Sequence, residues 1–197
     1  MKARVKKTLA DIPDIADIET ELKREKYKNQ YSVVLRSTIY TLITVAAVAI
    51  LVATLWLPVL QIYGESMTPT LQDGDIVLSL KGEKFATGDV IAFYYNNKIL
   101  VKRVIASSGD WVDIADDGAV YVNGQELEEP YLVEKALGEC NIKLPYQVPE
   151  SKVFVMGDHR SVSIDSRNTS VGCIAQEQIV GRLVFRLWPL SGLGAIQ

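Results

Sequence analysis

The sequence contains only one histidine and two cysteines among its 197 residues. These are too few, and too far apart, for the ligand spacings of a zinc site, so we expect no metal and no other cofactor. Cys140 and Cys173 are separated by 33 positions, which neither requires nor excludes a disulfide. A disulfide and a pair of buried free thiols therefore stay equally good interpretations. Internal repeats and low-complexity tracts are also absent.

Basic residues do not outnumber acidic ones in the long part of the chain that begins at residue 60. Residues 60–197 hold 12 basic and 18 acidic side chains. A surface that binds nucleic acid needs clustered positive charge, so no nucleic-acid partner is expected.

Charged residues are absent from one long segment, "STIYTLITVAAVAILVATLWLPV", which covers 23 residues at 37–59. As a helix it spans about 35 Å, enough to cross a hydrocarbon core of roughly 30 Å. A cleaved signal peptide has an apolar core of only about 7–15 residues near the N-terminus. Here 36 residues come first and no small-residue cleavage region follows, so we expect an uncleaved membrane anchor.

The charges that flank this segment predict its orientation. Five basic residues precede it within residues 22–36, and none occurs in residues 60–75: Lys23, Arg24, Lys26, Lys28 and Arg36. The positive-inside rule then predicts a single-pass protein of the cell membrane. Residues 1–36 are expected in the cytoplasm, with a short helix suggested by Ile15, Ile18 and Leu22, and residues 60–197 outside.

Beyond residue 60 the sequence changes to short β-rich runs separated by turn signals. Six strands are expected, at 76–80, 89–95, 99–107, 110–115, 152–158 and 179–188. The Asn-Gly pair within 120–127 predicts a tight hairpin turn. Many short strands without a long helical pattern favour an all-β sandwich or barrel, from which residues 126–149 form an unpatterned excursion.

Hydrolytic chemistry needs a nucleophile and a base, and "GESMTPTLQDGD" offers Ser66 directly after the apolar segment. The single histidine, His159, could pair with Ser66 and be oriented by Asp165. Lys102 is the other possible base, because its strand "ILVKRVIAS" is apolar and desolvation lowers the pKa of a buried lysine. On spacing alone, an exposed or snorkelling strand residue is the better interpretation of Lys102.

Three motifs in order distinguish these possibilities: "SMTPT" at 66–70, "KR" followed by "SGD" within 102–110, and "GDHRSVSIDSR" at 157–167. Together with one membrane anchor they resemble the bacterial type I signal peptidases, which remove signal peptides from exported proteins. "VYVNG" and "QVPESKVFVMGD" are also similar to that family, and the resemblance covers residues 37–190. It implies a β-rich catalytic domain whose apolar face lies at the outer membrane surface.

The resemblance also implies a role for each motif residue. Ser66 would be the nucleophile and Lys102 the general base, which Ser163 would orient by a hydrogen bond. Asp165 and Arg167 would form a supporting salt bridge near Arg103. The remaining motif residues would shape turns: Met67, Pro69, Thr70, Gly157 and Asp158.

Substrate would lie between residues 61–64 and 99–101, both of which lead into the catalytic pair. An extended signal peptide could bind there as an added strand. Its small side chains would enter a shallow pocket, and the family prefers alanine at the first and third positions before the cut. The expected lining residues are Ile62, Gly64, Met67, Leu71, Leu100 and Val101, which could equally be ordinary core.

Two positions depart from the family's pattern. His159 replaces a common asparagine, which a turn tolerates. Gly64 stands where some relatives have a serine that donates to the oxyanion hole, so the Ser66 backbone N–H is the main donor expected.

Three other classes of protein fit parts of the sequence. A self-cleaving Ser/Lys repressor needs a DNA-binding domain and a cleavage loop. A non-catalytic relative that assembles surface fibres would lack the serine or the lysine, and both are present. A purely structural β domain leaves the three ordered motifs unexplained.

Overall fold

The computed structural model describes residues 14–82 and 84–196, with only the helical backbone for 53–56. The chain divides into two compact units, residues 1–52 and 53–197. The first unit holds most of one helix, and the second holds every described strand.

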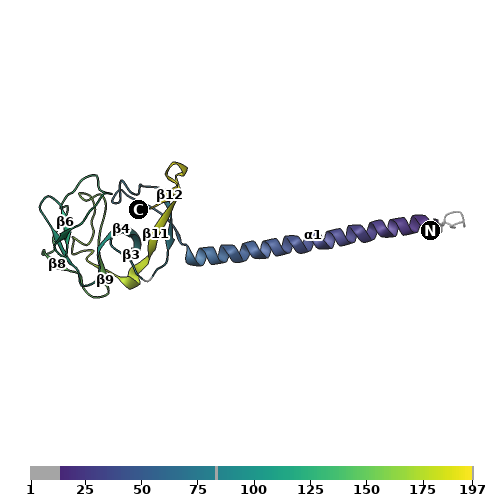
Figure 1. The fold of residues 1–197 in the computed structure, drawn as a ribbon, viewed down its shortest axis with the longest axis horizontal. Helices are drawn as coiled ribbons and strands as arrows, with labels where there is room; N and C mark the ends of the chain where they lie inside the picture. The colour runs from purple at the N-terminus through teal and green to yellow at the C-terminus, as the bar shows by residue number, and fades with distance from the viewer. Residues whose placement is uncertain (1–13, 83, 197) are drawn as a thin grey trace, which may run out of the picture. The chain divides into compact units, whose positions relative to one another are not determined.

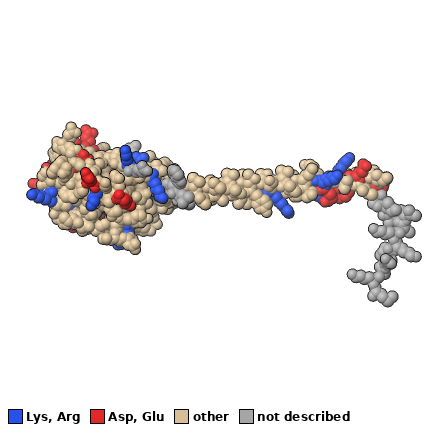
Figure 2. Space-filling view, turned by 90° about the horizontal axis from the view of Figure 1, so that it is seen from below, with Lys and Arg blue, Asp and Glu red and all other residues tan. Residues whose placement is uncertain are grey.

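Helix α1 runs from Ile15 to Trp56 and is 42 residues long. Asp14 accepts a hydrogen bond from the Ile15 N–H at 2.7 Å and so caps its start. The short helix expected near residues 15–22 and the apolar segment are therefore one element. Among the described residues, this is the one helix long and apolar enough to cross a membrane, over Ile15–Val52. Figure 2 shows charged side chains on its N-terminal part and an uncharged stretch beyond them.

The helix ends three residues before Val59, the expected end of the membrane segment. The helix ends at Trp56, just before Leu57 and Pro58, because a residue that precedes proline avoids the helical region of backbone space. Val59 instead begins the first strand, β1 (Val59–Gln61).

The second unit contains two antiparallel sheets, so the predicted β-rich fold is confirmed (Figure 1). The larger sheet has eight strands in the order β1-β2-β11-β3-β4-β9-β10, with β12 paired to β11. Its remaining strands are β2 (Ile76–Leu80), β3 (Val90–Tyr95), β4 (Lys98–Ala106), β9 (Lys152–Met156), β10 (Ile174–Ala175), β11 (Ile179–Trp188) and β12 (Gly194–Ala195).

The smaller sheet has the order β7-β6-β5-β8. Its strands are β5 (Trp111–Ile114), β6 (Val120–Val122), β7 (Gln125–Glu126) and β8 (Tyr146–Gln147). The Asn-Gly hairpin turn lies between β6 and β7, where Asn123 and Gly124 have φ of 53° and 78°. Positive φ at both central residues is what a type I′ turn requires.

Three clusters of buried residues form the core. One lies between the two sheets and includes Ile105, Val112 and Phe154. Another packs the turn that follows β1 against β2, β3 and β11, with Met67 and Leu71 almost fully buried. The third joins β3, β4 and β9. The turn that carries Ser66 is therefore anchored in the core.

Residues 127–145 connect the strands β7 and β8 without regular secondary structure, as expected for an excursion. This segment contacts the loop that follows β9. The backbone N–H of Asn141 donates to the Arg167 carbonyl at 3.0 Å.

Candidate active site

Ser66 and Lys102 meet although they are 36 positions apart. The Lys102 ammonium nitrogen Nζ lies 2.7 Å from Ser66 Oγ, within hydrogen-bond distance. Ser66 stands in the turn after β1, and Lys102 in the middle of β4, where it pairs with Ile91 of β3. Lys102 is only 3% exposed, so the contact lies largely out of water.

The turn of Ser66 is held by backbone hydrogen bonds on both sides. Ile62 N–H donates to Asp75 O at 2.8 Å, and Gly74 N–H donates to Ile62 O at 2.9 Å. Within the turn, Leu71 N–H donates to Met67 O at 2.9 Å. The apolar side chains of the turn enter the core, which leaves the serine hydroxyl facing Lys102.

Burial changes the acid–base behaviour of Lys102. Desolvation lowers its pKa from 10.5 to about 8, partly opposed by the negative charge of Asp165. The positive charge of Arg167 lowers the pKa further, and Asp158 raises it. A substantial fraction of Lys102 is thus neutral near pH 8, and a neutral amine can accept a proton.

Asp165 is fully buried and organises the loop after β9. It accepts hydrogen bonds from the Ser163 hydroxyl at 2.7 Å and from Gly157 N–H at 2.9 Å. Arg167 forms a buried salt bridge with it, Nε to Oδ1 at 2.8 Å. Burial alone would raise the pKa of Asp165, but the hydrogen bond and charge of Arg167 hold the pKa below its ordinary value.

One expectation for this loop is not met. Ser163 donates to Asp165, and no hydrogen bond joins it to Lys102 among the described residues. Ser163 and Asp165 lie in an irregular loop, because β9 ends at Met156.

Arg103, the neighbour of Lys102 in β4, has an acidic partner in the same loop. It pairs with Asp158, Nη2 to Oδ2 at 2.7 Å. The same carboxylate oxygen accepts from the Thr70 hydroxyl at 2.5 Å. Asp158 therefore connects the strand of Lys102 to the turn of Ser66.

An apolar cavity of about 510 Å³ opens beside the Ser66–Lys102 pair. Ile62, Gly64, Met67, Leu100 and Val101 line it as predicted. Leu71 does not line it, because this side chain is fully buried in the core behind the turn.

The strands that border this cavity have free backbone edges. Among the described strands, β1 pairs with β2 alone. Strand β4 pairs with β9 only from Arg103 onward, so Lys98–Lys102 have no partner on that side among the described strands. An extended peptide could pair with both edges.

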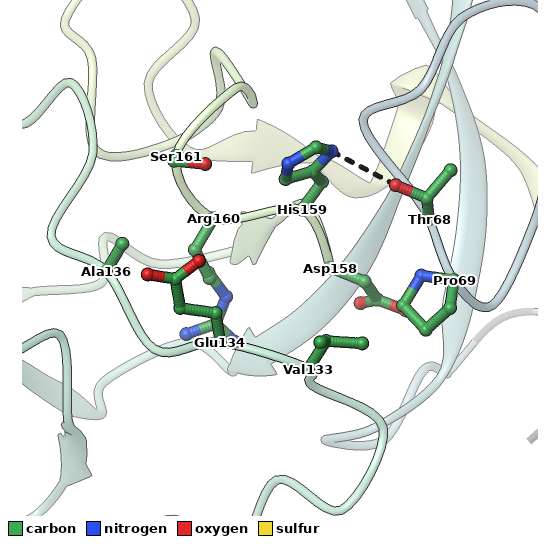
Figure 3. A pocket seen from close by; sticks show the side chains of 9 residues that line it. All are labelled: Thr68, Pro69, Val133, Glu134, Ala136, Asp158, His159, Arg160 and Ser161. Atoms are coloured by element: carbon green, nitrogen blue, oxygen red, sulfur yellow. Dashed lines mark hydrogen bonds between the residues drawn. The ribbon is translucent and has the colours of Figure 1, made fainter.

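A second, smaller cavity of about 230 Å³ lies on the other flank of the serine turn. Figure 3 shows Thr68 and Pro69 on one side of it and Val133, Glu134 and Ala136 on another. His159 also lines this cavity, and its Nδ1 lies 3.0 Å from Thr68 Oγ1. Its ring makes no hydrogen bond to the Ser66 hydroxyl or to Asp165 among the described contacts, so the geometry does not form the Ser66/His159/Asp165 triad.

Three residues that the sequence analysis did not single out, Glu129, Tyr131 and Arg160, form a network with Arg103 beside the site. Glu129 binds Arg160 through both of its carboxylate oxygens. Tyr131 donates to Glu129 at 2.8 Å, and its ring covers the Arg103 guanidinium at 3.8 Å. Burial, reinforced by Glu129, raises the pKa of Tyr131, so its hydroxyl stays a donor. No periodic pattern indicated Glu129 or Tyr131, because residues 126–149 follow neither helical nor strand spacing.

Cys140 and Cys173 are free thiols in the structure. Within residues 14–82 and 84–196, no cluster of three histidine, cysteine or acidic side chains could hold a metal ion.

Comparison with known proteins gives a consistent family. The model of the family "Signal peptidase, peptidase S26" matches residues 35–188. Signal peptidase IB of Staphylococcus aureus (strain COL) is 40% identical over 150 residues, which are 66% of this chain and 77% of that protein. Thylakoidal processing peptidase 1 of Arabidopsis thaliana is 38% identical over 143 residues, 64% of this chain and 40% of that protein.

Among solved structures, a signal peptidase I from Enterococcus faecalis V583 is 31% identical. The match covers 51% of this chain and 97% of that one, with a TM-score of 0.44.

The apolar helix, the β-rich unit and these matches define a membrane-anchored serine peptidase. More narrowly, the chain belongs to the signal peptidase family, peptidase S26, because the family model covers most of it. Its reaction is therefore the hydrolysis that removes signal peptides from exported preproteins, as in type I signal peptidases.

Proposed function

We propose that this protein cleaves signal peptides with Ser66 as nucleophile and Lys102 as general base. Neutral Lys102 accepts the Ser66 proton, and the serine oxygen attacks the scissile carbonyl. The protonated Lys102 then gives its proton to the departing amine, which is the N-terminus of the mature protein. Lys102 next activates a water molecule that hydrolyses the acyl-enzyme and releases the signal peptide.

One observation carries this proposal: the Nζ–Oγ distance of 2.7 Å at a lysine that is almost fully buried. A serine hydroxyl is a weak nucleophile unless a base lies within hydrogen-bond reach. A lysine is such a base only where burial lowers its pKa, and the pKa of Lys102 is about 8. Asp165, Ser163 and Arg167 support this site from the loop after β9.

The signal peptide would bind in the 510 Å³ cavity as a strand between β1 and the first half of β4. Both strands run toward the catalytic pair, and β1 begins three residues after the membrane helix ends. Ile62, Met67, Leu100 and Val101 leave a shallow apolar pocket, which favours small residues such as alanine before the cut. The backbone N–H of Ser66 would stabilise the oxyanion, with no side-chain donor at Gly64.

We also propose a membrane topology for the enzyme. Helix α1 would anchor it in the lipid bilayer, with residues 1–36 in the cytoplasm and residues 60–197 outside as the catalytic domain. The mechanism uses no metal or other cofactor, and the acidic balance of residues 60–197 offers no surface for nucleic acid.

The test is cleavage of a preprotein with an Ala-X-Ala site by the purified full-length chain in detergent. We expect wild type to cut at that site. Ser66→Ala and Lys102→Ala should each lower the cleavage rate at least about a thousandfold, because both side chains take part in the same proton transfer. His159→Ala is the matched control and should keep most activity, because its ring contacts Thr68 and not the serine hydroxyl.

An active Lys102→Ala variant beside an inactive His159→Ala variant would show that the histidine is the base and the mechanism is wrong. Failure of the folded wild type to cut any preprotein would favour a non-catalytic relative that assembles surface fibres.

A further inference from the structure

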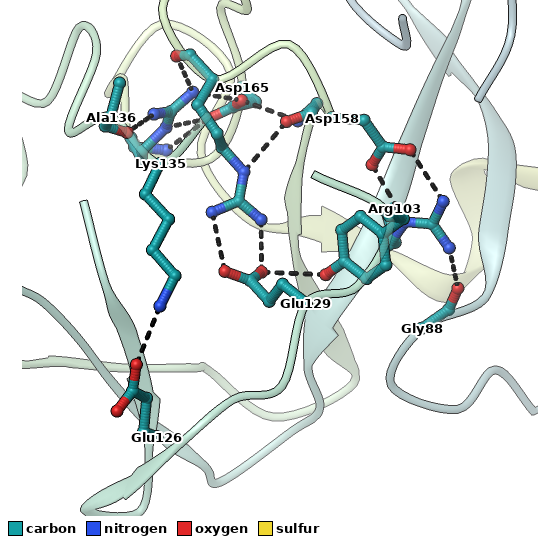
Figure 4. Close-up of polar contacts among 12 residues, drawn as sticks. Gly88, Arg103, Glu126, Glu129, Lys135, Ala136, Asp158 and Asp165 are labelled. Atoms are coloured by element: carbon teal, nitrogen blue, oxygen red, sulfur yellow. Dashed lines mark hydrogen bonds and ion pairs between the residues drawn. The ribbon is translucent and has the colours of Figure 1, made fainter. Parts of the chain in front are cut away.

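The segment between β7 and β8 places two side chains, Glu129 and Tyr131, against the loop that follows β9. The Glu129 side chain is fully buried. It accepts hydrogen bonds from Arg160 Nη1 at 3.2 Å, from Arg160 Nη2, and from the Tyr131 hydroxyl at 2.8 Å. Figure 4 shows Glu129 within this network, with Arg103 and Asp158 to one side of it.

The two arginines of this network each lead to the reacting pair. Arg103 directly follows Lys102 in β4 and binds Asp158 through two hydrogen bonds, at 2.9 and 2.7 Å. Arg160 donates from Nε to the Gly157 carbonyl at 3.1 Å, which closes the turn at 157–160.

That turn contacts the serine turn at three points. His159 N–H donates to the Ser66 carbonyl at 3.1 Å, and Asp158 accepts from the Thr70 hydroxyl at 2.5 Å. His159 Nδ1 meets the Thr68 hydroxyl. Gly157 also lies so close to Ser66 O that an added Cβ would clash with it. A shift of the 157–160 turn would therefore move Ser66.

Glu129 supplies the buried negative charge that pairs with Arg160. Arg103, Asp158, Arg160 and Glu129 have side chains at most 2% exposed, and they form two opposite-charge pairs. A buried arginine that loses its carboxylate is strongly destabilised and moves toward water or another acceptor. Movement of Arg160 would break its hydrogen bond to the Gly157 carbonyl. The turn at 157–160, which contacts Ser66, would then be free to shift.

We propose that Glu129 and Tyr131 are positioning residues of the peptidase: Glu129 fixes Arg160, and Tyr131 joins Glu129 to Arg103, so that Ser66 and Lys102 keep their reacting distance. This inference rests on the proposed roles of Ser66 and Lys102. Glu129 and Tyr131 touch neither the substrate cavity nor the reacting atoms, so they act through the turn alone. Displacement of a reacting group by about 1 Å can cost about a hundredfold in rate.

The decisive variants are Glu129→Gln and Tyr131→Phe, compared with Glu126→Gln. Glu126 lies in the same part of the chain but forms an exposed ion pair with Lys135, about half accessible to water. The measurement is steady-state cleavage of a signal-peptide substrate by the full chain in detergent, below the melting temperature of each variant.

We expect Glu129→Gln to lower kcat about tenfold or more and to leave KM within about twofold, because the substrate cavity is untouched. Tyr131→Phe keeps the ring over Arg103 and removes only the hydroxyl, so its kcat should fall a few-fold. Glu126→Gln should match wild type in both constants. A general loss of structure would instead reduce the folded fraction, which the melting curve reports separately.

Folded Glu129→Gln with wild-type kcat, or with raised KM and unchanged kcat, would overturn the proposal. If Glu129→Gln does not fold, Tyr131→Phe decides, and an unchanged kcat overturns it. Absence of cleavage by wild type would reject the proposed function. If wild type cleaves and both variants have the same kcat as wild type, only the roles of Glu129 and Tyr131 are rejected.

Discussion

Lys102 lies among charges of both signs, and burial decides its protonation. Its neighbours partly cancel, since Asp165 and Asp158 raise its pKa while Arg167 lowers it. Desolvation is the largest effect and lowers the pKa to about 8. The apolar strand around Lys102 is therefore part of the proposed chemistry and not only part of the core.

This pKa predicts the pH dependence of cleavage. The proposed base acts only when neutral, and the neutral fraction of Lys102 grows as pH rises through about 8. We expect kcat/KM to rise about tenfold per pH unit well below that value and to level off above it. The profile should be measured for wild type and for His159→Ala, which should share one midpoint.

A midpoint near 6.5, the ordinary value for histidine, that vanishes in His159→Ala would contradict the lysine mechanism. A midpoint near 8 in both proteins would agree with it. Substrates without titratable groups near the cut keep the profile a property of the enzyme.

At the scale of elements, the segment that follows β7 supports the loop after β9 at two places. Glu129 binds Arg160, and further along the carbonyls of Ala136 and Leu137 accept from Arg167 Nη1 at 3.3 and 2.7 Å. Gly138 follows directly, with φ of +62°. A Cβ there would clash with the Arg160 carbonyl and lie 2.7 Å from Arg167 Nη1.

Gly138→Ala should consequently lower both stability and kcat. Gly172→Ala is a matched control, because Gly172 has φ of +63° and open space around the added Cβ. In the control, the free energy of unfolding should fall only by the cost of a left-handed backbone conformation for alanine, about 1–2 kcal/mol. It should fall more in Gly138→Ala, since the loop carrying Arg160 and Arg167 must shift. Thermal melting in detergent and the cleavage rate test this, and equal effects of the two variants would show that the close approach is unimportant.

Short sequence patterns predicted the strands and turns, because these depend on neighbouring residues. Runs of β-favouring residues between turn signals located the strands, and the apolar environment of Lys102 identified it as a possible base. The partners of Ser163 and Arg103 could not be predicted, because a loop and not a strand carries Asp165, and Asp158 is the nearer carboxylate. Glu129 and Arg160 are 31 positions apart, and long-range pairing of that kind leaves no periodic signal.

At the scale of the whole molecule, a β-rich unit follows a helix that is long and apolar enough to cross a membrane. The two units are chemically distinct. The helix has an uncharged stretch between residues 37 and 56, and the following residues have an acidic balance. A signal peptide has a short apolar core of about 7–15 residues. In the proposed topology, an anchored peptidase would meet this apolar segment at the membrane surface. The proposed cavity is bordered by β1, the first strand after the helix.

The proposed topology predicts which thiols are accessible from outside the cell. The chain has two cysteines, both free and both in the unit of residues 53–197. A membrane-impermeant maleimide added to intact cells should therefore label the protein. Cys140 should react faster, because burial raises the pKa of Cys173 to about 11 and keeps it a thiol. Cys140→Ser should lose most of the label, and Cys173→Ser should keep it.

The control for the opposite side is Asn29→Cys in a chain that also carries Cys140→Ser and Cys173→Ser. Asn29 is exposed on α1 within the basic stretch that the positive-inside rule places in the cytoplasm. This thiol should react only after the membrane is opened. The reverse result, with Asn29→Cys labelled in intact cells and Cys140 protected, would place the catalytic unit in the cytoplasm. A signal peptidase there would face the wrong side of the membrane for its substrates, so the same experiment also bears on the proposed function.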